Sequence, residues 1–556
     1  MNASSSMSTF NDSTLNSDFL NSSITLGCDS SPSAHNNKSV DFYDIEPLPP
    51  AIQALLQSNE APLHSQSLQS NLHDAQTTLA NLDVCLDSLR TEIALLAAKR
   101  NQITFTIKSY RNVLHPIRRT PPEVLLEIFS YCVPFVDTTS ASAEKIQENN
   151  SLNTKLAPWT FGQVCKHWRF IVLECPRLWS SLSLNVDQFL AANLSLGRQI
   201  EYRAIDLLSN FLRRSKDCPL TIAIHSLQPF SPIFSLICSH SERWSNVLLS
   251  LHAGAFPHLS LIKGRLPKLK NLHLRNLGGW DDRVPAIDAF EYAPNLSVIR
   301  ASEIPGIATK LLLPWGQLTC CHNMCFTGNE RDPITLDNKR ILSQAVKLRH
   351  AILSCSGHAR RLTLTSLTHH TLSSLNIGLF HRRDIELLCQ FLDALTLPSL
   401  GTLYITASDR ETVCHNVQSL VRLVERSKCR LARLRLKGFQ TDVDEDPHFR
   451  SLLTLVPTLG SLDLDRYPNS LLNALMVKED DSGPPLLPRL RQLYVFTPSP
   501  DMNQKLFIDV VESRVQHSNL NLLATSPQLV WKDAARARLE SLDIKILNEN
   551  LFKSRM

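Results

Sequence analysis

Glycine is scarce in this sequence, and the motifs that depend on it are missing. Only 16 of the 556 residues are Gly, well below the usual level of about 7%. The chain contains no GxGxxG or GxxxxGK[ST] phosphate loop, no GxSxG elbow and no HExxH zinc motif. We therefore expect a protein that is not an enzyme, with no catalytic residues and no cofactor.

Long apolar runs and closely paired cysteines are missing as well. No run approaches the roughly 18 residues of a membrane span, and the 14 Cys include no CxxC pair. The first residues show no basic stretch followed by an apolar one. These absences predict no signal peptide, no membrane contact, reduced thiols, and a location in the cytoplasm, the nucleus or both.

Two further classes of ligand are not expected. The net charge is only +5 and no long Lys/Arg tract occurs, which argues against nucleic-acid binding. One compact cluster of metal-ligand types is present, formed by Cys320, Cys321, His322 and Cys325. Adjacent ligands strain tetrahedral geometry, so we expect small buried side chains there and no metal.

The beginning of the chain has the composition of a disordered segment. Residues 1–40 hold twelve Ser and six Asn, with scattered single apolar residues. Such a segment cannot bury enough apolar area to offset its ordering entropy. We predict a disordered tail and linker over residues 1–66.

Leucine is abundant, with 92 residues in the chain, and over residues 68–114 it follows a seven-residue repeat. Such a repeat predicts a coiled-coil helix over residues 67–115, ended by Pro116. The expected partner is a second copy of the chain, and packing against the chain's own domain is the alternative. Arg100 occupies a core position, where it would either fix the register or break the seam. The repeat positions are Leu68, Leu72, Ala75, Leu79, Leu82, Leu86, Leu89, Ile93, Leu96, Arg100, Ile103, Ile107, Tyr110 and Leu114.

Residues 116–182 have the pattern of a small helical unit. Thr120 to Glu123 resembles a capping box, with Thr as the N-cap. Two amphipathic helices follow, separated by a polar loop over 133–156. So small a unit has little core of its own, and we expect it to dock an apolar face on a partner. The two faces are Val124, Leu125, Ile128, Phe129 and Cys132, and Val164, Trp168, Ile171, Val172 and Cys175.

This unit resembles the F-box, whose pattern is LPxEILxxIFxxL, a variable gap, VCxxWR and then LW. Thr120 and Cys132 stand where the family pattern has Leu. The whole arrangement is similar to the large F-box families of mushroom-forming (basidiomycete) fungi. The matching residues are Pro121, Glu123, Val124, Leu125, Ile128 and Phe129, then Val164, Cys165, Trp168 and Arg169, and finally Leu178 and Trp179.

The resemblance implies a function. F-box domains bind a Skp-type adaptor, which joins them to cullin and RING subunits, and the F-box protein selects the substrate. The expected function is therefore that of the substrate-recognition subunit of an SCF-type E3 ubiquitin ligase. The alternative is an F-box/coiled-coil interaction scaffold acting outside a ubiquitin ligase. By position, the resemblance implies adaptor binding at Pro121, Leu125, Ile128, Phe129, Val164 and Trp168.

A leucine-rich unit recurs in the C-terminal two thirds of the chain. Its pattern is Leu-x-x-Leu-x-[LIV], often after Pro, and the period is near that of leucine-rich repeats. Each unit supplies one short parallel strand and a return segment. We predict a leucine-rich-repeat-like domain over 244–556 after a connecting segment over 183–243. The copies are 267–274, 398–405, 429–436, 457–464, 488–495 and 537–544, with weaker ones at 294–301, 346–353 and 370–377, and an early one at 244–251.

The predicted fold is therefore of the α+β/α/β class, with a disordered tail, a long coiled-coil helix, a small all-α F-box and an α/β solenoid. Strand alternation turns the Leu residues inward and the intervening residues toward a concave face, where we expect an unknown protein substrate to bind. Some charged residues there lie opposite one another, and cross-strand ion pairing is the alternative role for them. The predicted substrate-binding residues are Asn271, His273, Arg275, Tyr404, Arg433, Arg435, Lys437, Asp463, Asp465 and Tyr494.

Overall fold

The computed structural model forms two units, Met1–Arg118 and Arg119–Met556. Residues 1–47 of the predicted tail and linker lie outside the described residues. The structure describes residues 48–548 apart from 59–60, 63–64, 140–141, 191–193, 229–231, 279, 281–283, 326–333, 357–363, 382–383, 408–416, 440, 442–443, 445–446, 478–484, 496–502, 519, 526–530, 532 and 543.

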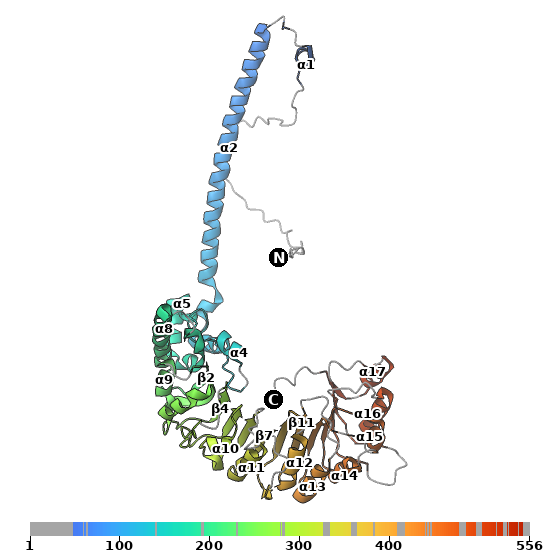
Figure 1. Ribbon diagram of the computed structural model, residues 1–556. Coiled ribbons are helices and arrows are strands. Elements are labelled where there is room, and N and C mark those ends of the chain that lie inside the picture. Colours follow the sequence, from blue (N-terminus) through green and yellow to red (C-terminus); the bar gives the residue numbers. More distant parts are fainter. Residues whose placement is uncertain are drawn as a thin grey trace. The chain divides into compact units, whose positions relative to one another are not determined.

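The first unit contains two helices, α1 (Pro50–Ser58) and α2 (Ser65–Leu114) (Figure 1). Helix α1 corrects the prediction of an unstructured linker, because Ile52, Leu55 and Leu56 have helical spacing there. Helix α2 confirms the long helix predicted over 67–115. Its 50 residues span about 75 Å at 1.5 Å per residue, and none of them is buried.

The second unit begins with a helical segment that differs from the prediction at both helix starts. Helix α3 begins one residue late, with Pro121 as N-cap and no side-chain capping bond, so the capping box is not formed. The last helix starts only at Lys166, because Cys165 is extended and its Sγ accepts a hydrogen bond from Trp168 N (3.4 Å). The elements are η1 (Pro116–Arg119), α3 (Pro122–Cys132), α4 (Ala143–Glu148), α5 (Phe161–Val164), α6 (Lys166–Glu174) and η2 (Pro176–Trp179).

Fourteen strands of the described chain form one parallel sheet, in which neighbours follow the chain order. This arrangement is the α/β solenoid that the leucine repeat predicts. The strands are β1 (Ser181–Asn185), β2 (Leu220–Ser226), β3 (Trp244–Leu251), β4 (Asn271–Asn276), β5 (Val298–Ser302), β6 (Cys320–Met324), β7 (His350–Cys355), β9 (Ser374–Leu379), β11 (Thr402–Ala407), β12 (Arg433–Lys437), β13 (Ser461–Leu464), β14 (Gln492–Val495), β15 (Leu522–Thr525) and β16 (Lys545–Asn548).

Two repeat boundaries differ from the prediction. The sheet begins at Ser181, so the boundary drawn at residue 244 falls inside it, and the expected connecting segment 183–243 contributes β2 and most of β1. The copy predicted at 537–544 is mainly helix α17 (Asp533–Glu540), and the last strand, β16, follows it. The helix forms because Ala534, Ala535 and Ala537 favour helix over strand.

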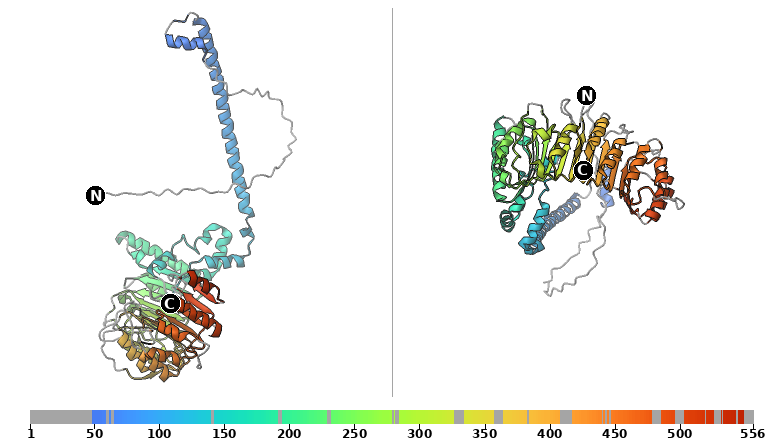
Figure 2. Two further views of the ribbon diagram at one scale, coloured as in Figure 1. Left: turned by 90° about the vertical axis from the view of Figure 1, so that its right-hand side faces the viewer. Right: turned by 90° about the horizontal axis from the view of Figure 1, so that it is seen from below.

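Helices and short 3-10 turns return the chain between strands. Figure 1 shows that the sheet lines the inner side of the curved solenoid and that the helices lie on the outer side, and Figure 2 shows the same two layers. Strands β8 (Leu367–Thr368) and β10 (Leu395–Thr396) form a separate pair. The returns include α7 (Asp187–Leu190), α8 (Leu194–Arg214), α9 (Pro232–Ser239), η3 (Ser241–Arg243), η4 (Ala253–Ile262), α10 (Ile307–Lys310), η5 (Trp315–Gln317), α11 (Ile334–Gln344), α12 (Asp384–Ala394), α13 (Gln418–Ser427), α14 (Pro447–Leu455), α15 (Asn469–Leu475) and α16 (Gln504–Ser518).

The core lies between these two layers. Leu272, Leu403, Leu434, Leu462 and Leu493 are almost fully buried, as strand alternation predicts for the Leu positions. Each such side chain contributes about 1.5–3 kcal/mol when fully buried. The repeated Leu pattern therefore supplies most of the energy that stacks one strand on the next. No helix in the described part of the chain combines the length and apolar character needed to cross a membrane.

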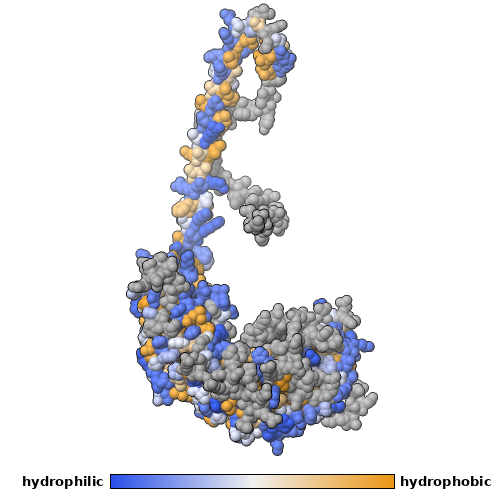
Figure 3. Space-filling model, in the orientation of Figure 1, coloured by the Kyte–Doolittle hydropathy of each residue, from blue (hydrophilic) through white to orange (hydrophobic). Residues whose placement is uncertain are grey.

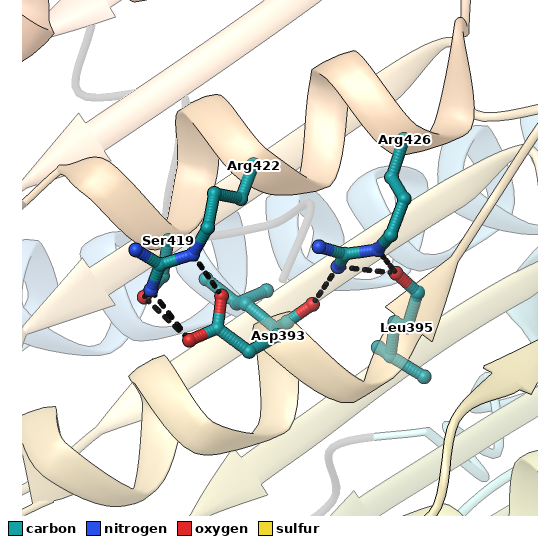
Figure 4. Close-up of polar contacts among 6 residues, drawn as sticks. Asp393, Leu395, Ser419, Arg422 and Arg426 are labelled. Carbon is teal, nitrogen blue, oxygen red and sulfur yellow. Dashed lines mark hydrogen bonds and ion pairs between the residues drawn. The ribbon is translucent and has the colours of Figure 1, made fainter.

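Polar contacts join successive helices of the outer layer (Figure 4). Arg422 of α13 donates from Nε to Asp393 Oδ1 (2.9 Å) and from Nη2 to Oδ2 (2.6 Å). One turn later, Arg426 Nη2 donates to the carbonyl oxygens of Leu392 (2.9 Å) and Leu395 (2.7 Å). Leu392 lies in the last turn of helix α12 and Leu395 directly follows that helix, so the guanidinium lies at a helix C-terminus, where a cation is favourable. The contacts fix how one repeat sits on the next.

Candidate functional site

Helix α3 buries one face and exposes the other. Leu125 and Phe129, four residues apart, are buried, whereas Val124, Ile128 and Tyr131 are exposed. The spacing from 124 to 128 to 131 is that of one helix face. Tyr131 exposes 82% of its surface. Three large apolar side chains thus lie on the exposed face of this short helix, which makes that face a candidate interaction surface.

An aromatic cluster holds α3 against the helices that follow it. The ring of Phe129 stacks on Phe161, with centroids 4.4 Å apart, and meets Trp168 edge-on at 4.7 Å. Trp168 is half-buried by this contact. Val164 lies between these two partners in the sequence, and 61% of it is exposed. The cluster thus presents Val164 beside a rigid aromatic support.

The six predicted adaptor residues fall into two groups. Pro121, Ile128 and Val164 are exposed, whereas Leu125 and Phe129 are buried behind the surface and Trp168 is half-buried. Two further exposed side chains were missed, Tyr131 and Phe135. Tyr131 lies three residues after Ile128, so extending the helical spacing would have identified it, whereas Phe135 lies beyond the end of α3 at Cys132.

Residues 133–156 cover one end of the sheet, which corrects the prediction of a polar loop. Ile146 of α4 is buried in an apolar cluster with Ala223 of β2 and Leu248 of β3. Ser151 N donates to Ser183 O (2.9 Å), and Ser183 N donates back to Ser151 Oγ (2.9 Å). These bonds satisfy backbone groups on the outer side of β1, which is an edge strand. The segment therefore closes both the edge and the concave face at β1–β3.

His273 of β4 lies at the limit of this covered region. Its Nδ1 lies 3.1 Å from Thr138 O and its Nε2 lies 3.2 Å from Ser302 Oγ. A carbonyl oxygen only accepts, so Nδ1 carries a proton and donates. Burial lowers the pKa of His273 to about 4, which keeps the ring neutral at pH 7. Its predicted place on an open binding surface is therefore corrected, because the segment before α4 covers it.

The charges predicted on β12 and β13 pair with one another. Arg435 Nε contacts Asp463 Oδ2 across the two strands, and both residues are buried. The Arg435 guanidinium also lies 4.7 Å over the ring of Tyr404. Burial raises the pKa of Asp463, and the charge of Arg435 acts against that shift. The alternative of cross-strand ion pairing is thus the arrangement that these two residues adopt.

Several other predicted substrate residues make local polar contacts. Asp465 Oδ2 accepts from Gly438 N (2.8 Å), and the Tyr494 hydroxyl donates to Gln492 Oε1 (3.2 Å). Burial lowers the pKa of Lys437. The amide of Asn271 donates to Asn246 on β3. These groups are half-buried and shape the surface of the sheet.

The predicted residue Arg433 is exposed and lines a pocket at the amino ends of β12–β14. Arg491, Ser461 and Gln492 line the same pocket. Arg275 is half-buried at the far end of β4. The two predicted arginines therefore lie in different parts of the concave face.

A basic group on the central strands was missed by the sequence reasoning. Strand register aligns His273, Arg300 of β5 and His322 of β6 in one row. His350 of β7 is exposed beside Cys320. Arg300 is half-buried, and its side chain has no hydrogen bond or ion pair within the described chain. The weak repeats at 294–301 and 346–353 contain Arg300 and His350, so those repeats could have predicted both residues. Strand β6 has no Leu pattern, so His322 could not be predicted in this way.

The electrostatics of this group leave Arg300 as its positive charge. Burial lowers the pKa of His322 to about 4, and Arg300, His273 and His350 lower it further. Burial is also the main reason that His273 is neutral. The charges of Arg275 and Arg300 lower its pKa further, whereas the charge of Asp137 acts against that decrease. Two neutral imidazoles therefore flank a guanidinium that has no carboxylate partner among the described residues.

The cysteine cluster does not form a metal site in the described structure. Strand alternation puts Cys321 and Cys325 in the core, whereas Cys320 and His322 face the concave side. Burial raises the pKa of Cys321 well above its ordinary value. No group of three potential ligands occurs among the described residues. Neither protein-family models nor curated proteins match this sequence, so the candidate surfaces are interpreted from their geometry.

Proposed function

We propose that the chain is the substrate-recognition subunit of an SCF-type ubiquitin ligase, with the exposed face of α3 and α5 as the surface for a Skp-type adaptor. The observation that supports this most directly is the exposure of Ile128, Tyr131 and Val164 beside the aromatic cluster that surrounds the buried ring of Phe129. An apolar helix face of this kind suits a helical partner with a complementary groove. The part of the concave sheet that residues 133–156 leave open would then hold the target protein.

Adaptor binding is tested with an Ile128→Asp, Tyr131→Asp double variant of the full chain. Mixed with a fungal Skp-type adaptor, the natural chain should form a stable complex. The variant should bind at least about a hundredfold more weakly, because two apolar side chains that the adaptor covers in the complex are replaced by charges that lose their hydration there. Calorimetry gives both affinities, and circular dichroism checks that the variant is folded.

Tyr202 and Val346 provide the matched control, since both are exposed apolar residues of the solenoid. The Tyr202→Asp, Val346→Asp chain should bind the adaptor like the natural chain. Equal losses in the two double variants would count against the α3 surface. A folded natural chain that binds no adaptor would favour the scaffold function, as would an adaptor complex from which cullin is always absent.

Helix α2 supports a second part of the proposal, a homodimer. Its repeat positions are all unburied, and Leu79 and Ile93 expose 60% and 65% of their surface. Figure 3 shows apolar side chains along this helix. With 50 residues, α2 is more than twice as long as any other helix in the described chain. A second copy supplies a helix of equal length with the same repeat, and Arg100 favours two strands over a larger bundle.

Two neighbouring leucines make a matched test of this dimer. Leu96 is a repeat position, whereas Leu95 lies outside the seam. Leu96→Asp should shift the sedimenting mass from that of a dimer toward the 62.5 kDa of one chain, because a charge in the seam loses its solvation. Leu95→Asp should remain dimeric. A monomeric natural chain, or equal effects of the two substitutions, would contradict the dimer.

A further inference from the structure

The open part of the concave face carries a positive charge that no described residue of the chain neutralises. Arg300 lies on β5, between His273 of β4 and His322 of β6. Within the described chain its side chain makes neither a hydrogen bond nor an ion pair. A half-buried guanidinium has lost part of its hydration, and a buried charge ordinarily has a partner. The absent partner is the first sign of a ligand.

The neighbours of Arg300 are suited to an anion. His322 Nε2 lies 3.4 Å from Cys320 Sγ, and His350 is exposed on the adjacent strand. Neighbouring strands lie about 5 Å apart, so Arg300 and His322, which are paired on adjacent strands, are close enough to face one small acidic group, and His350 lies one strand further along on the same surface. Arg presents a planar set of donors that matches a carboxylate or a phosphoryl group.

The surroundings limit where such a ligand can lie. On one side, residues 133–156 cover the sheet as far as His273. On the other side, Arg435 is already paired with Asp463 and packed on Tyr404. Among the described strand residues between these limits, Arg300 is the one arginine or lysine on the concave side, and most of the residues around it are uncharged. That composition fits a short acidic segment better than the polyanionic backbone of a nucleic acid, which needs several cations in a row.

We propose that the central strands β5–β7 bind an acidic segment of the target protein, whose carboxylate or phosphoryl group pairs with Arg300 beside His322 and His350. This inference rests on the proposed function and names the class of substrate that the concave face selects. The ligand occupies the place that a carboxylate of the chain would otherwise fill. Arg300 sets the position of the acidic group, and the flanking surface reads the residues next to it.

The probe for this site is a fluorescein-labelled peptide of six glutamates, with a six-glutamine peptide as its neutral counterpart. Fluorescence anisotropy with the full chain should show binding of the acidic peptide only. Arg300→Glu should weaken that binding at least about tenfold, and Arg300→Gln should weaken it less. A phosphoserine peptide with neutral flanks separates the two chemistries: tighter binding than hexaglutamate assigns the site to phosphoryl groups, and weaker binding assigns it to carboxylates.

Arg450→Glu is the matched control, because Arg450 is exposed on the outer helix α14 and changes the net charge equally. It should leave binding unchanged. A similar loss in this control would reduce the effect to overall charge and overturn the proposal. Loss in Arg433→Glu without loss in Arg300→Glu would move the anion to the pocket at β12–β14 and overturn it as well. Equal binding of the six-glutamate and six-glutamine peptides would also overturn the proposal.

The pH dependence of peptide binding is an independent test, because a folding defect would not produce the same dependence. The groups that act on His322 are Arg300, His273 and His350, all of which favour its neutral form. A bound anion favours the imidazolium, so peptide binding should strengthen as the pH is lowered from 7.5 toward the pKa of about 4 of unliganded His322. His322→Gln should weaken that dependence while leaving binding at pH 7.5. Adaptor binding measured on the same preparations separates this inference from the proposed function: an adaptor complex without peptide binding defeats only the anion site.

Discussion

Replacement of Trp179 by Ala is expected to lower the free energy of unfolding of the second unit by about 3–5 kcal/mol. Trp179 ends the helical segment and is 1% exposed. Its ring meets Trp159 edge-on at 4.9 Å and Phe211 of α8 at 5.5 Å, while the Arg214 guanidinium lies 4.5 Å over it. Its Nε1 donates to Val172 O (3.0 Å). The substitution removes all of these contacts and leaves a large cavity.

Denaturation of the full chain in urea, followed by circular dichroism, measures this loss. Phe170→Ala serves as the control, because Phe170 lies on the neighbouring helix with 66% of its surface exposed. We expect that control to change stability by less than about 1 kcal/mol. Since Trp179 joins the helical segment to α8, Trp179→Ala should also weaken adaptor binding. A variant as stable as the natural chain would show that the two parts fold independently of this contact.

The strands with a strong leucine pattern could be predicted from the sequence, and those without one could not. In β12 and β13, Leu434, Leu436, Leu462 and Leu464 alternate with polar residues, and the pattern alone locates both strands. Strand β6 has the sequence Cys-Cys-His-Asn-Met, which carries no such period. It becomes a strand because β5 and β7 present backbone partners on either side of it.

Of the candidate surfaces, the α3 face could also be predicted from the sequence, whereas the cover over the sheet could not. The exposed face of α3 follows from helical spacing, which is a local property of the chain. The cover over β1–β3 depends on Ser151 meeting Ser183 and on Thr138 meeting His273. These pairs are far apart in the sequence, and no periodicity links them. The concave face could therefore be predicted as a row of residues, but its closed and open parts could not be separated.

Arg514 should be the residue of the C-terminal repeats whose loss costs most. It lies on α16 with 1% of its surface exposed. Its Nε donates to Leu475 O (2.6 Å), its Nη1 to Leu487 O (2.9 Å) and its Nη2 to Leu486 O (2.5 Å). Burial lowers the pKa of Arg514 to about 10, so the guanidinium remains charged at pH 7. One side chain thus satisfies carbonyl groups from two separate segments.

Arg514→Met is expected to lower the free energy of unfolding by about 3–6 kcal/mol, because it keeps most of the volume but leaves two buried carbonyls and one half-buried carbonyl without this donor, at about 1–3 kcal/mol for each buried group. A hydrophobic replacement of a buried charge is often neutral when its partner charge is removed as well. Here the acceptors belong to the backbone and remain in place. Arg514→Lys should be intermediate, since an ammonium cannot reproduce the planar set of donors.

Urea denaturation tests this order, with Arg491→Met as the control at an exposed arginine of the same region. The control should leave the midpoint nearly unchanged. A stable Arg514→Met chain would mean that water enters and binds the three carbonyls. A Lys variant as unstable as the Met variant would show that the geometry of the guanidinium, and not its charge, holds α15 and the turn before β14 against α16.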